Sequence, residues 1–177
     1  MRRRNFLLTA LGGGLALMSN CGWANTAPLP EARLRLFNTH TGERIDALYR
    51  DARGEYRNDA LGALNELFRC HHTGEVARMD LAVLDFLNQA SSHVGAEREI
   101  HVISGYRSPA YNALLRARGH GVAKHSLHLE GRAVDVRIPG VRLASLHEAA
   151  LKLKLGGVGF YPGSDFVHLD SGRVRRW

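Results

Sequence analysis

The sequence predicts a single α+β domain. Its 177 residues, 45% of them hydrophobic, are enough to build one ordinary globular core. Segments with apolar residues at helical spacing come early in the chain, and short strand-like segments bounded by glycine and proline gather later. Helices first and a compact set of strands later are typical of the α+β class.

Residues 1–24 are expected to be a signal peptide rather than part of the domain. Three arginines precede an apolar stretch from Phe6 to Met18, which is too short to span a bilayer. The segment Arg3-Arg4-Asn5-Phe6-Leu7 matches the twin-arginine export pattern R-R-x-F-L, with a plain Sec signal as the alternative. Cleavage is expected after Ala24, and lipidation at Cys21 is the other option.

Such a signal predicts a periplasmic protein that the twin-arginine export machinery delivers and that is not stably inserted in a membrane. Loss of the three arginines lowers the formal net charge from +7 to +4. This modest excess suits an anionic wall polymer and does not indicate nucleic-acid binding. Only Cys70 remains in the mature chain, so no intramolecular disulfide is expected.

A loose lead-in is expected at residues 25–31, which contain two prolines, and the folded domain at residues 32–177. The domain should open with a hairpin. Residues 32–38 alternate leucine with arginine, Thr41-Gly42 supplies turn residues, and a weaker strand follows at 45–49.

Two amphipathic helices are expected next, at residues 59–69 and 80–93. Both segments repeat large apolar residues at a spacing of three to four. Asp59 and Asp80 precede the repeats and are the expected N-caps, because a carboxylate there accepts hydrogen bonds from the first free backbone N–H groups.

Cap and turn residues bound the remaining elements. Ser108-Pro109 reads as a cap followed by a proline in the first helical turn, Pro139-Gly140 ends a strand, and Gly156-Gly157 stops a helix. The expected elements are a strand at 99–104, a helix at 109–118, a strand at 132–138, a helix at 143–155, and strands at 157–161 and 166–169.

Two histidines and an aspartate on neighbouring segments are candidate metal ligands. Asp135 shares one face of its strand with the small Ala133, and His128 precedes that strand. If the last strand pairs with this one, His168 joins them. Three protein ligands and one open position are what a catalytic zinc site needs. Two histidines and a carboxylate also form the facial triad of mononuclear iron oxygenases. In those enzymes, however, the ligands usually occur in the sequence as His-x-Asp followed by a distant His.

Three further residues are candidates for the chemistry. Arg107, in a loop after a predicted strand, can polarise a carbonyl and stabilise an oxyanion; a salt bridge to a neighbouring carboxylate is its alternative role. Asp165 is the candidate general base, provided that it sits in the turn after Pro162-Gly163-Ser164; otherwise it only caps that turn. Asp170 is expected to orient a metal ligand.

Four residues are candidate parts of a substrate cleft: Ser126, His125, Tyr106 and Tyr161. The cluster Cys70-His71-His72 is not expected to bind metal, since no partner lies at ligand spacing and the cluster follows a helix end, where histidine is favourable anyway. Arg173, Arg175 and Arg176 are expected to form a solvated basic edge.

These motifs resemble those of the zinc D-alanyl-D-alanine peptidases of the VanX and VanY kind and of the related L-alanyl-D-glutamate endopeptidases. The matching motifs are S-x-H-x-x-G-x-A-x-D at 126–135, S-G-Y-R-S at 104–108 and D-x-x-H at 165–168. Within that family the sequence is most similar to the murein endopeptidase K group, over residues 32–177, with further likeness at 37–43 and 156–161.

The resemblance implies the compact α+β fold shared with the hedgehog signalling domain, with a small, mostly antiparallel sheet and flanking helices. It implies one Zn²⁺ held by His128, Asp135 and His168. It also implies Asp165 as the catalytic acid/base and Arg107 as the carbonyl-polarising residue. Many relatives have Glu at position 165 and His at position 170, and the shorter Asp165 has less reach.

The expected function is zinc-dependent hydrolysis of peptide crosslinks in peptidoglycan, by a murein endopeptidase that acts in cell-wall remodelling. One alternative is a D,D-carboxypeptidase that trims the same wall peptides. The other is a wall-binding module that keeps the zinc fold without catalysis. Retention of Asp165 and Arg107 argues against the binding module.

Overall fold

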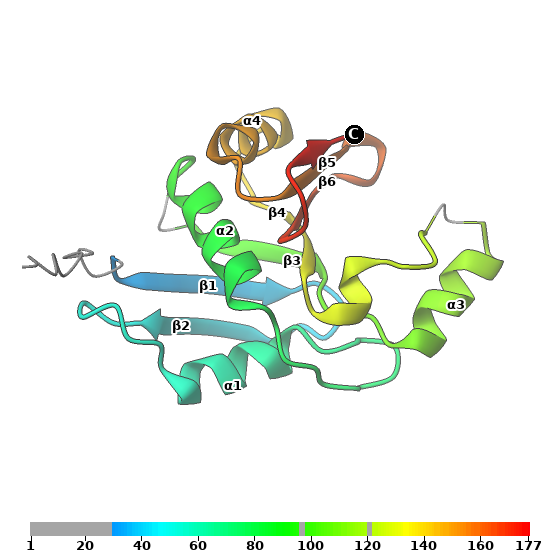
Figure 1. The fold of residues 1–177 in the computed structure, drawn as a ribbon, viewed down its shortest axis with the longest axis horizontal. Coiled ribbons are helices and arrows are strands. Elements are labelled where there is room, and N and C mark those ends of the chain that lie inside the picture. The colour runs from blue at the N-terminus through cyan, green and yellow to red at the C-terminus, as the bar shows by residue number, and fades with distance from the viewer. Residues whose placement is uncertain (1–29, 96–97, 120–121) are drawn as a thin grey trace, which may run out of the picture.

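A computed structural model describes residues 30–177, apart from residues 96–97 and 120–121 (Figure 1). The predicted signal peptide and nearly all of the lead-in therefore lie outside the described residues. Within the described ranges, no helix has the length and apolar character needed to cross a membrane.

A seven-stranded sheet is the frame of the domain, with strand order β2-β1-β3-β4-β6-β5-β7. Four neighbouring pairs are antiparallel, and the β1–β3 and β5–β7 pairs are parallel. The strands are β1 (Ala32–Asn38), β2 (Arg44–Arg50), β3 (Ile100–Ser104), β4 (Ala133–Arg137), β5 (Gly157–Tyr161), β6 (Phe166–Asp170) and β7 (Arg175–Arg176). The predicted α+β class with a mostly antiparallel sheet is confirmed.

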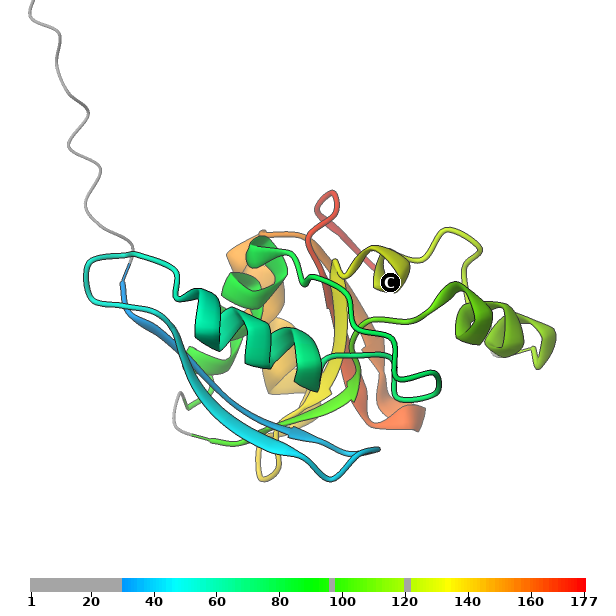
Figure 2. The ribbon, with the colours of Figure 1, turned by 90° about the horizontal axis from the view of Figure 1, so that it is seen from below.

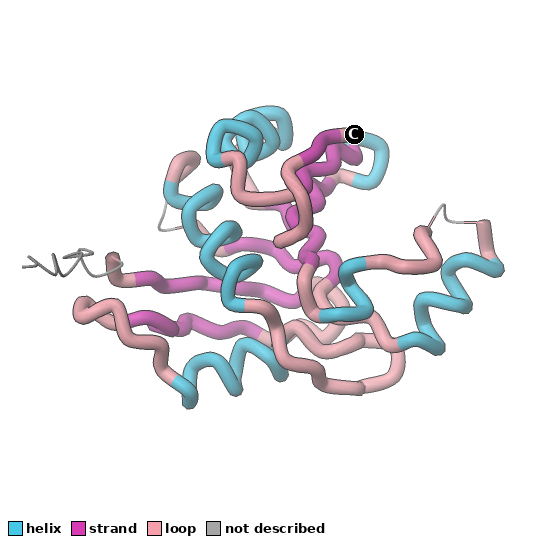
Figure 3. The backbone as a smooth tube through the Cα atoms, viewed as in Figure 1, coloured by secondary structure: helices cyan, strands magenta, loops and turns pink. Residues whose placement is uncertain are grey.

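Helices α1 (Asn58–Leu67), α2 (Leu81–Ser92) and α4 (Leu143–Leu153) pack against the sheet and share its core, whereas α3 (Pro109–Ala117) stands apart from them (Figures 1 and 2). Two single-turn helices, η1 (Leu127–Glu130) and η2 (Pro162–Ser164), interrupt the loops (Figure 3). Neither these turns nor β7 follow from the sequence patterns.

The helix starts follow the capping predictions in two cases of three. Asp80 accepts a hydrogen bond from the Ala82 amide at 3.1 Å, and Ser108 accepts one from the Tyr111 amide at 3.2 Å. The prediction for Asp59 was wrong, because α1 starts one residue earlier, after Arg57. Asp59 lies in the first turn instead, where its negative charge interacts favourably with the positive end of the helix dipole.

Strand alternation divides the functional residues from the core. Val134 and Val136 of β4, with Val167 and Leu169 of β6, point into the cluster shared with the helices. The intervening side chains, including Asp135 and His168, must point to the opposite face because successive residues of a strand alternate. The polar site is therefore built on the face of the sheet that the helices leave open.

Candidate metal centre

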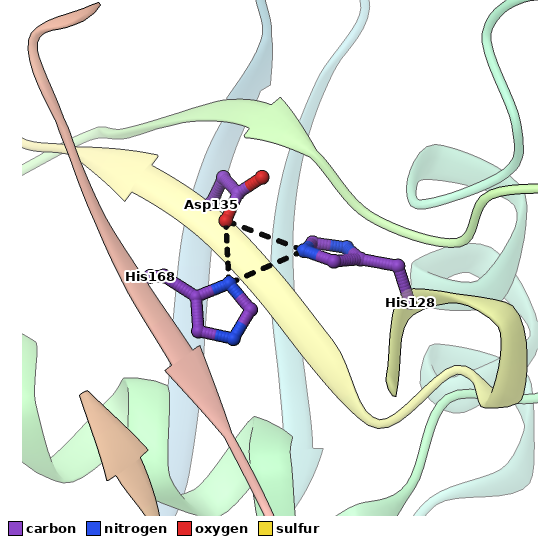
Figure 4. Close-up of side chains that lie close together, drawn as sticks. All are labelled: His128, Asp135 and His168. Atoms are coloured by element: carbon purple, nitrogen blue, oxygen red, sulfur yellow. Dashed lines mark hydrogen bonds and ion pairs between the residues drawn. The ribbon is translucent and has the colours of Figure 1, made fainter. Parts of the chain in front are cut away.

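Asp135 and His168 face each other across the β4–β6 ladder. The register of this antiparallel pair places them directly opposite, as expected if these two strands pair. Opposed residues of neighbouring strands have their Cβ atoms about 5 Å apart, close enough for direct contact. Nδ1 of His168 lies 2.7 Å from Oδ1 of Asp135 (Figure 4).

His128 approaches the same point from η1. Its Nε2 lies 3.3 Å from both Oδ1 of Asp135 and Nδ1 of His168, and its ring is almost fully buried. The turn that follows ends on Gly131 at a φ of 65°, where an added Cβ would collide with the Arg78 carbonyl oxygen. Glycine is therefore needed at the step that carries the chain from His128 into β4.

The outer hydrogen bonds of both imidazoles determine what their inner nitrogens can do. Nδ1 of His128 lies 2.7 Å from the Gly105 carbonyl oxygen, which can only accept, so this nitrogen donates. Nε2 of His168 lies 3.0 Å from Oδ2 of Asp170 and donates in the same way. In neutral rings the two inner nitrogens then carry lone pairs, which face each other and a carboxylate oxygen.

This donor set fits a cation. The three inner atoms lie within 4.8 Å of one another, and two imidazoles plus one carboxylate are ligands that zinc prefers. Burial lowers the pKa of His128 and so keeps its ring neutral. Burial also acts to lower the pKa of His168, but hydrogen bonds to Asp135 and Asp170 outweigh it and raise that pKa. A proton on His168 and a metal ion therefore compete for the same nitrogen.

Asp170 anchors His168 from behind. It has no exposed surface, and its carboxylate accepts hydrogen bonds from the Gly157 and Gly172 amides and from two nitrogens of Arg175. Burial opposes ionisation, but the hydrogen bonds from His168 and Arg175 prevail and lower the pKa of Asp170. A carboxylate behind a ligating histidine fixes the ring's tautomer and orientation.

Arg107 lies beside the three candidate ligands. Its Nε donates to Oγ of Ser104 at 3.0 Å, and Nη2 donates to Oδ2 of Asp135 at 2.7 Å. The salt bridge considered as its alternative role is therefore present. Among the described residues, the third nitrogen, Nη1, makes no hydrogen bond. Arg107 thus steadies Asp135 and keeps one donor for another group in the cleft.

A cleft of about 500 Å³ opens over these residues. Of the weaker sequence candidates, His125, Ser126 and Tyr161 line it. Tyr106 is not among the described residues that line it, because this side chain packs against the hydrophobic core. The volume lies in the range of pockets that hold small ligands.

Comparison with known proteins identifies relatives of this chain. The family model described as "Peptidoglycan L,D-endopeptidase MepK" matches residues 27–177. The chain is 42% identical to peptidoglycan L,D-endopeptidase MepK of Escherichia coli K12 over 174 residues, which is 96% of this chain and 94% of the relative. The chain belongs to the MepK family. A probable MepK of Haemophilus influenzae is 38% identical over 173 residues, 95% of this chain and 92% of that relative.

Asp165 occupies a different place in this MepK-family structure from the other site candidates. It lies in the turn after η2, as its predicted role requires, with a φ of 53°. Its carboxylate, however, is 65% exposed and accepts a hydrogen bond from Nη1 of Arg137 at 2.9 Å. Asp165 is not among the described residues that line the cleft.

Arg175 and Trp177 are among the residues of the MepK-family cleft that the sequence analysis did not identify as site candidates. Arg175 was expected to be solvated, but it is one-third exposed, binds the buried Asp170 and lines the cleft. Trp177 also lines the cleft and lies against His168, with ring centroids 5.3 Å apart. No periodic signal marks either residue, because both reach the site through β7, a strand of two residues.

The cluster Cys70-His71-His72 lies outside the cleft lining of this MepK-family chain. Sγ of Cys70 donates to Oγ of Ser108 at 3.5 Å in the interior. His71 stacks on His40 at 3.7 Å between ring centroids and contacts the Tyr111 hydroxyl. These side chains make a packed aromatic cluster.

Proposed function

We propose that this protein is a zinc-dependent endopeptidase that hydrolyses peptide crosslinks of peptidoglycan in the periplasm, after export by the twin-arginine route. The observation that carries the proposal is the convergence of His128 Nε2, His168 Nδ1 and Asp135 Oδ1 on one point beside a cleft of about 500 Å³. The names of the MepK relatives supply the substrate class.

In this proposal His128, Asp135 and His168 hold one zinc ion. Zinc supplies Lewis-acid polarisation of the amide carbonyl and activation of a water molecule. Asp170 holds the ring of His168 in the tautomer that turns Nδ1 toward the ion. Nη1 of Arg107 donates a hydrogen bond to the oxygen on which negative charge develops during attack on the amide.

Proton transfer is assigned to Asp165 in the same proposal. Its backbone adjoins Phe166, which lines the cleft. The proposed role requires the carboxylate to leave Arg137 and turn toward the substrate. Catalytic hydrogen bonds often form only when substrate is bound. The substrate-free position of Asp165 is therefore compatible with an acid/base role. The substitution Asp165→Asn tests this role.

The names of the relatives favour an endopeptidase over a D,D-carboxypeptidase on the same wall peptides. Product analysis separates the two, because an endopeptidase divides crosslinked muropeptides into smaller units and a carboxypeptidase releases single terminal residues. The presence of Arg107 and Asp165 favours a catalytic protein over a wall-binding module, because a binding module would need neither residue.

The direct test is digestion of purified crosslinked muropeptides by the zinc-loaded protein, followed by mass spectrometry. Wild type should cleave the crosslinks, and His128→Ala should lose both bound zinc and cleavage. His93→Ala is the matched control, because His93 is exposed at the end of α2. Intact crosslinks after treatment with zinc-loaded wild type would refute the function.

A further inference from the structure

Trp177 stands at the rim of the cleft, beside a candidate zinc ligand. Its ring centroid lies 5.3 Å from that of His168, and 48% of the residue is exposed. Large aromatic side chains are usually more buried than this, because burying them contributes strongly to stability. An exposed tryptophan next to a reactive centre is suited to contact with a ligand.

The ring is fixed in place although it is exposed. The backbone of Trp177 exchanges hydrogen bonds with β5, from Phe160 N to its carbonyl oxygen and from its own amide to the Val158 carbonyl oxygen. Nε1 of the indole donates to the Tyr161 hydroxyl at 2.6 Å. The guanidinium of Arg175 lies 4.7 Å from the ring centroid. A side chain held by these contacts has already lost the rotamer freedom that ligand binding would otherwise take from it.

Gly159 makes room for this arrangement. It lies opposite His168 in the β5–β6 register. A Cβ at this position would come within 2.8 Å of the rings of both Trp177 and Tyr161. The two rings can therefore lie close over β5 only because residue 159 has no side chain.

A continuous aromatic wall results on one side of the candidate zinc site. Tyr161 stacks on Phe166 with ring centroids 4.6 Å apart, and Trp177 extends the row to His168. The cleft lining also includes the aliphatic side chains of Val122 and Leu127. A peptide whose carbonyl lies at His168 can place an adjoining residue against this wall.

We propose that Trp177, oriented by Tyr161, is the substrate-binding wall that holds the aliphatic side chain of the residue next to the scissile bond. The inference rests on the proposed endopeptidase function and adds the residue that positions the substrate. Aromatic rings bury large apolar area against aliphatic groups, and an indole that is already fixed offers it at low entropic cost.

Kinetics on crosslinked muropeptides test the wall. Trp177→Ala should lower kcat/KM by about 10- to 100-fold, mainly through a higher KM, because the lost contact exists before and during the reaction. Trp177→Phe keeps an aromatic ring and should lower kcat/KM less than Trp177→Ala does. Tyr161→Phe loses only the hydroxyl and should also lower kcat/KM less. Val174→Ala is the matched control, since Val174 is exposed near the same strand and outside the cleft lining. Zinc content should stay unchanged in all four variants, and each should remain folded at the assay temperature.

A second readout does not depend on turnover. Trp23 lies in the expected signal peptide, so Trp177 is the only tryptophan of the mature protein. Rapid mixing of the zinc-loaded mature protein with crosslinked muropeptides should change the tryptophan fluorescence before product appears. A saturable change in fluorescence without any cleavage would support substrate binding at Trp177 and refute the endopeptidase function. If crosslinks are cleaved without a change in fluorescence, and kcat/KM is unchanged in Trp177→Ala and Trp177→Phe, Trp177 does not bind the substrate.

Discussion

Arg175 binds Asp170 with two hydrogen bonds, from Nη1 at 2.9 Å and from Nη2 at 2.7 Å. The carboxylate is fully buried, so this pair keeps a charge in the interior next to a candidate zinc ligand. Without such partners, burial would favour the neutral form of this carboxyl, which holds the imidazole N–H of His168 less strongly. The charged pair therefore belongs to the candidate metal site as much as the candidate ligands do.

Asp170→Asn should weaken zinc binding by roughly 10- to 100-fold, because the carboxylate behind His168 sets the tautomer of that ring. Competition with a chromophoric chelator measures the affinity. Asp46→Asn is the matched control, since Asp46 pairs with Arg33 on the exposed hairpin. Equal zinc affinity in wild type and Asp170→Asn would show that Asp170 serves only the packing around it.

Arg107→Lys should lower kcat by about 100- to 1,000-fold, which is the usual cost of removing one donor to an oxyanion. Lysine keeps the positive charge near Asp135 but cannot contact Ser104, Asp135 and substrate at once. Bound zinc, measured by mass spectrometry of the metal, should remain at one ion per chain. If zinc is lost along with activity, Arg107 acts through Asp135 and not on the substrate.

Asp165→Asn separates the acid/base role from a surface ion pair. The proposed role predicts a loss of about 100-fold or more in kcat. The pair with Arg137 is exposed, so its loss should cost less than about 1 kcal/mol of unfolding free energy. Arg137→Ala is the control, because it frees the carboxylate and should leave kcat near the wild-type value. A kcat within twofold of wild type in Asp165→Asn would assign proton transfer to another group.

His71 should make the protein less stable as the pH falls below neutrality. Burial, helped by nearby His40, His72 and Arg107, lowers the pKa of His71 from 6.5 to about 4. Between these values the unfolded chain binds a proton at His71 and the folded chain does not, so the free energy of unfolding decreases from about pH 6.5 to about pH 4. Above this window the contribution is constant.

The variant His71→Phe keeps an aromatic ring against Tyr111 and cannot titrate. Urea unfolding at several pH values should therefore show a shallower acid-side decline for His71→Phe than for wild type. Parallel declines in the two proteins would mean that His71 titrates alike in the folded and unfolded chain.

The sequence predicted the parts of the site that depend on regular structure. Alternation along residues 133–137 and 166–170 places Asp135 and His168 on one face, and pairing of these strands brings the two side chains together. The position of Asp165 depends on which neighbour its side chain meets, and Arg137 comes from another strand. Arg175 and Trp177 reach the cleft through long-range pairing of a two-residue strand, which no local pattern encodes.

The place of β6 in the sheet has a consequence for how the protein is made. This strand comes late in the chain but lies between β4 and β5. Until residues 166–170 leave the ribosome, β4 has an unpaired edge made of nearly all-buried side chains, and such edges attract other strands. Chains interrupted before Phe166 should therefore accumulate as insoluble aggregates.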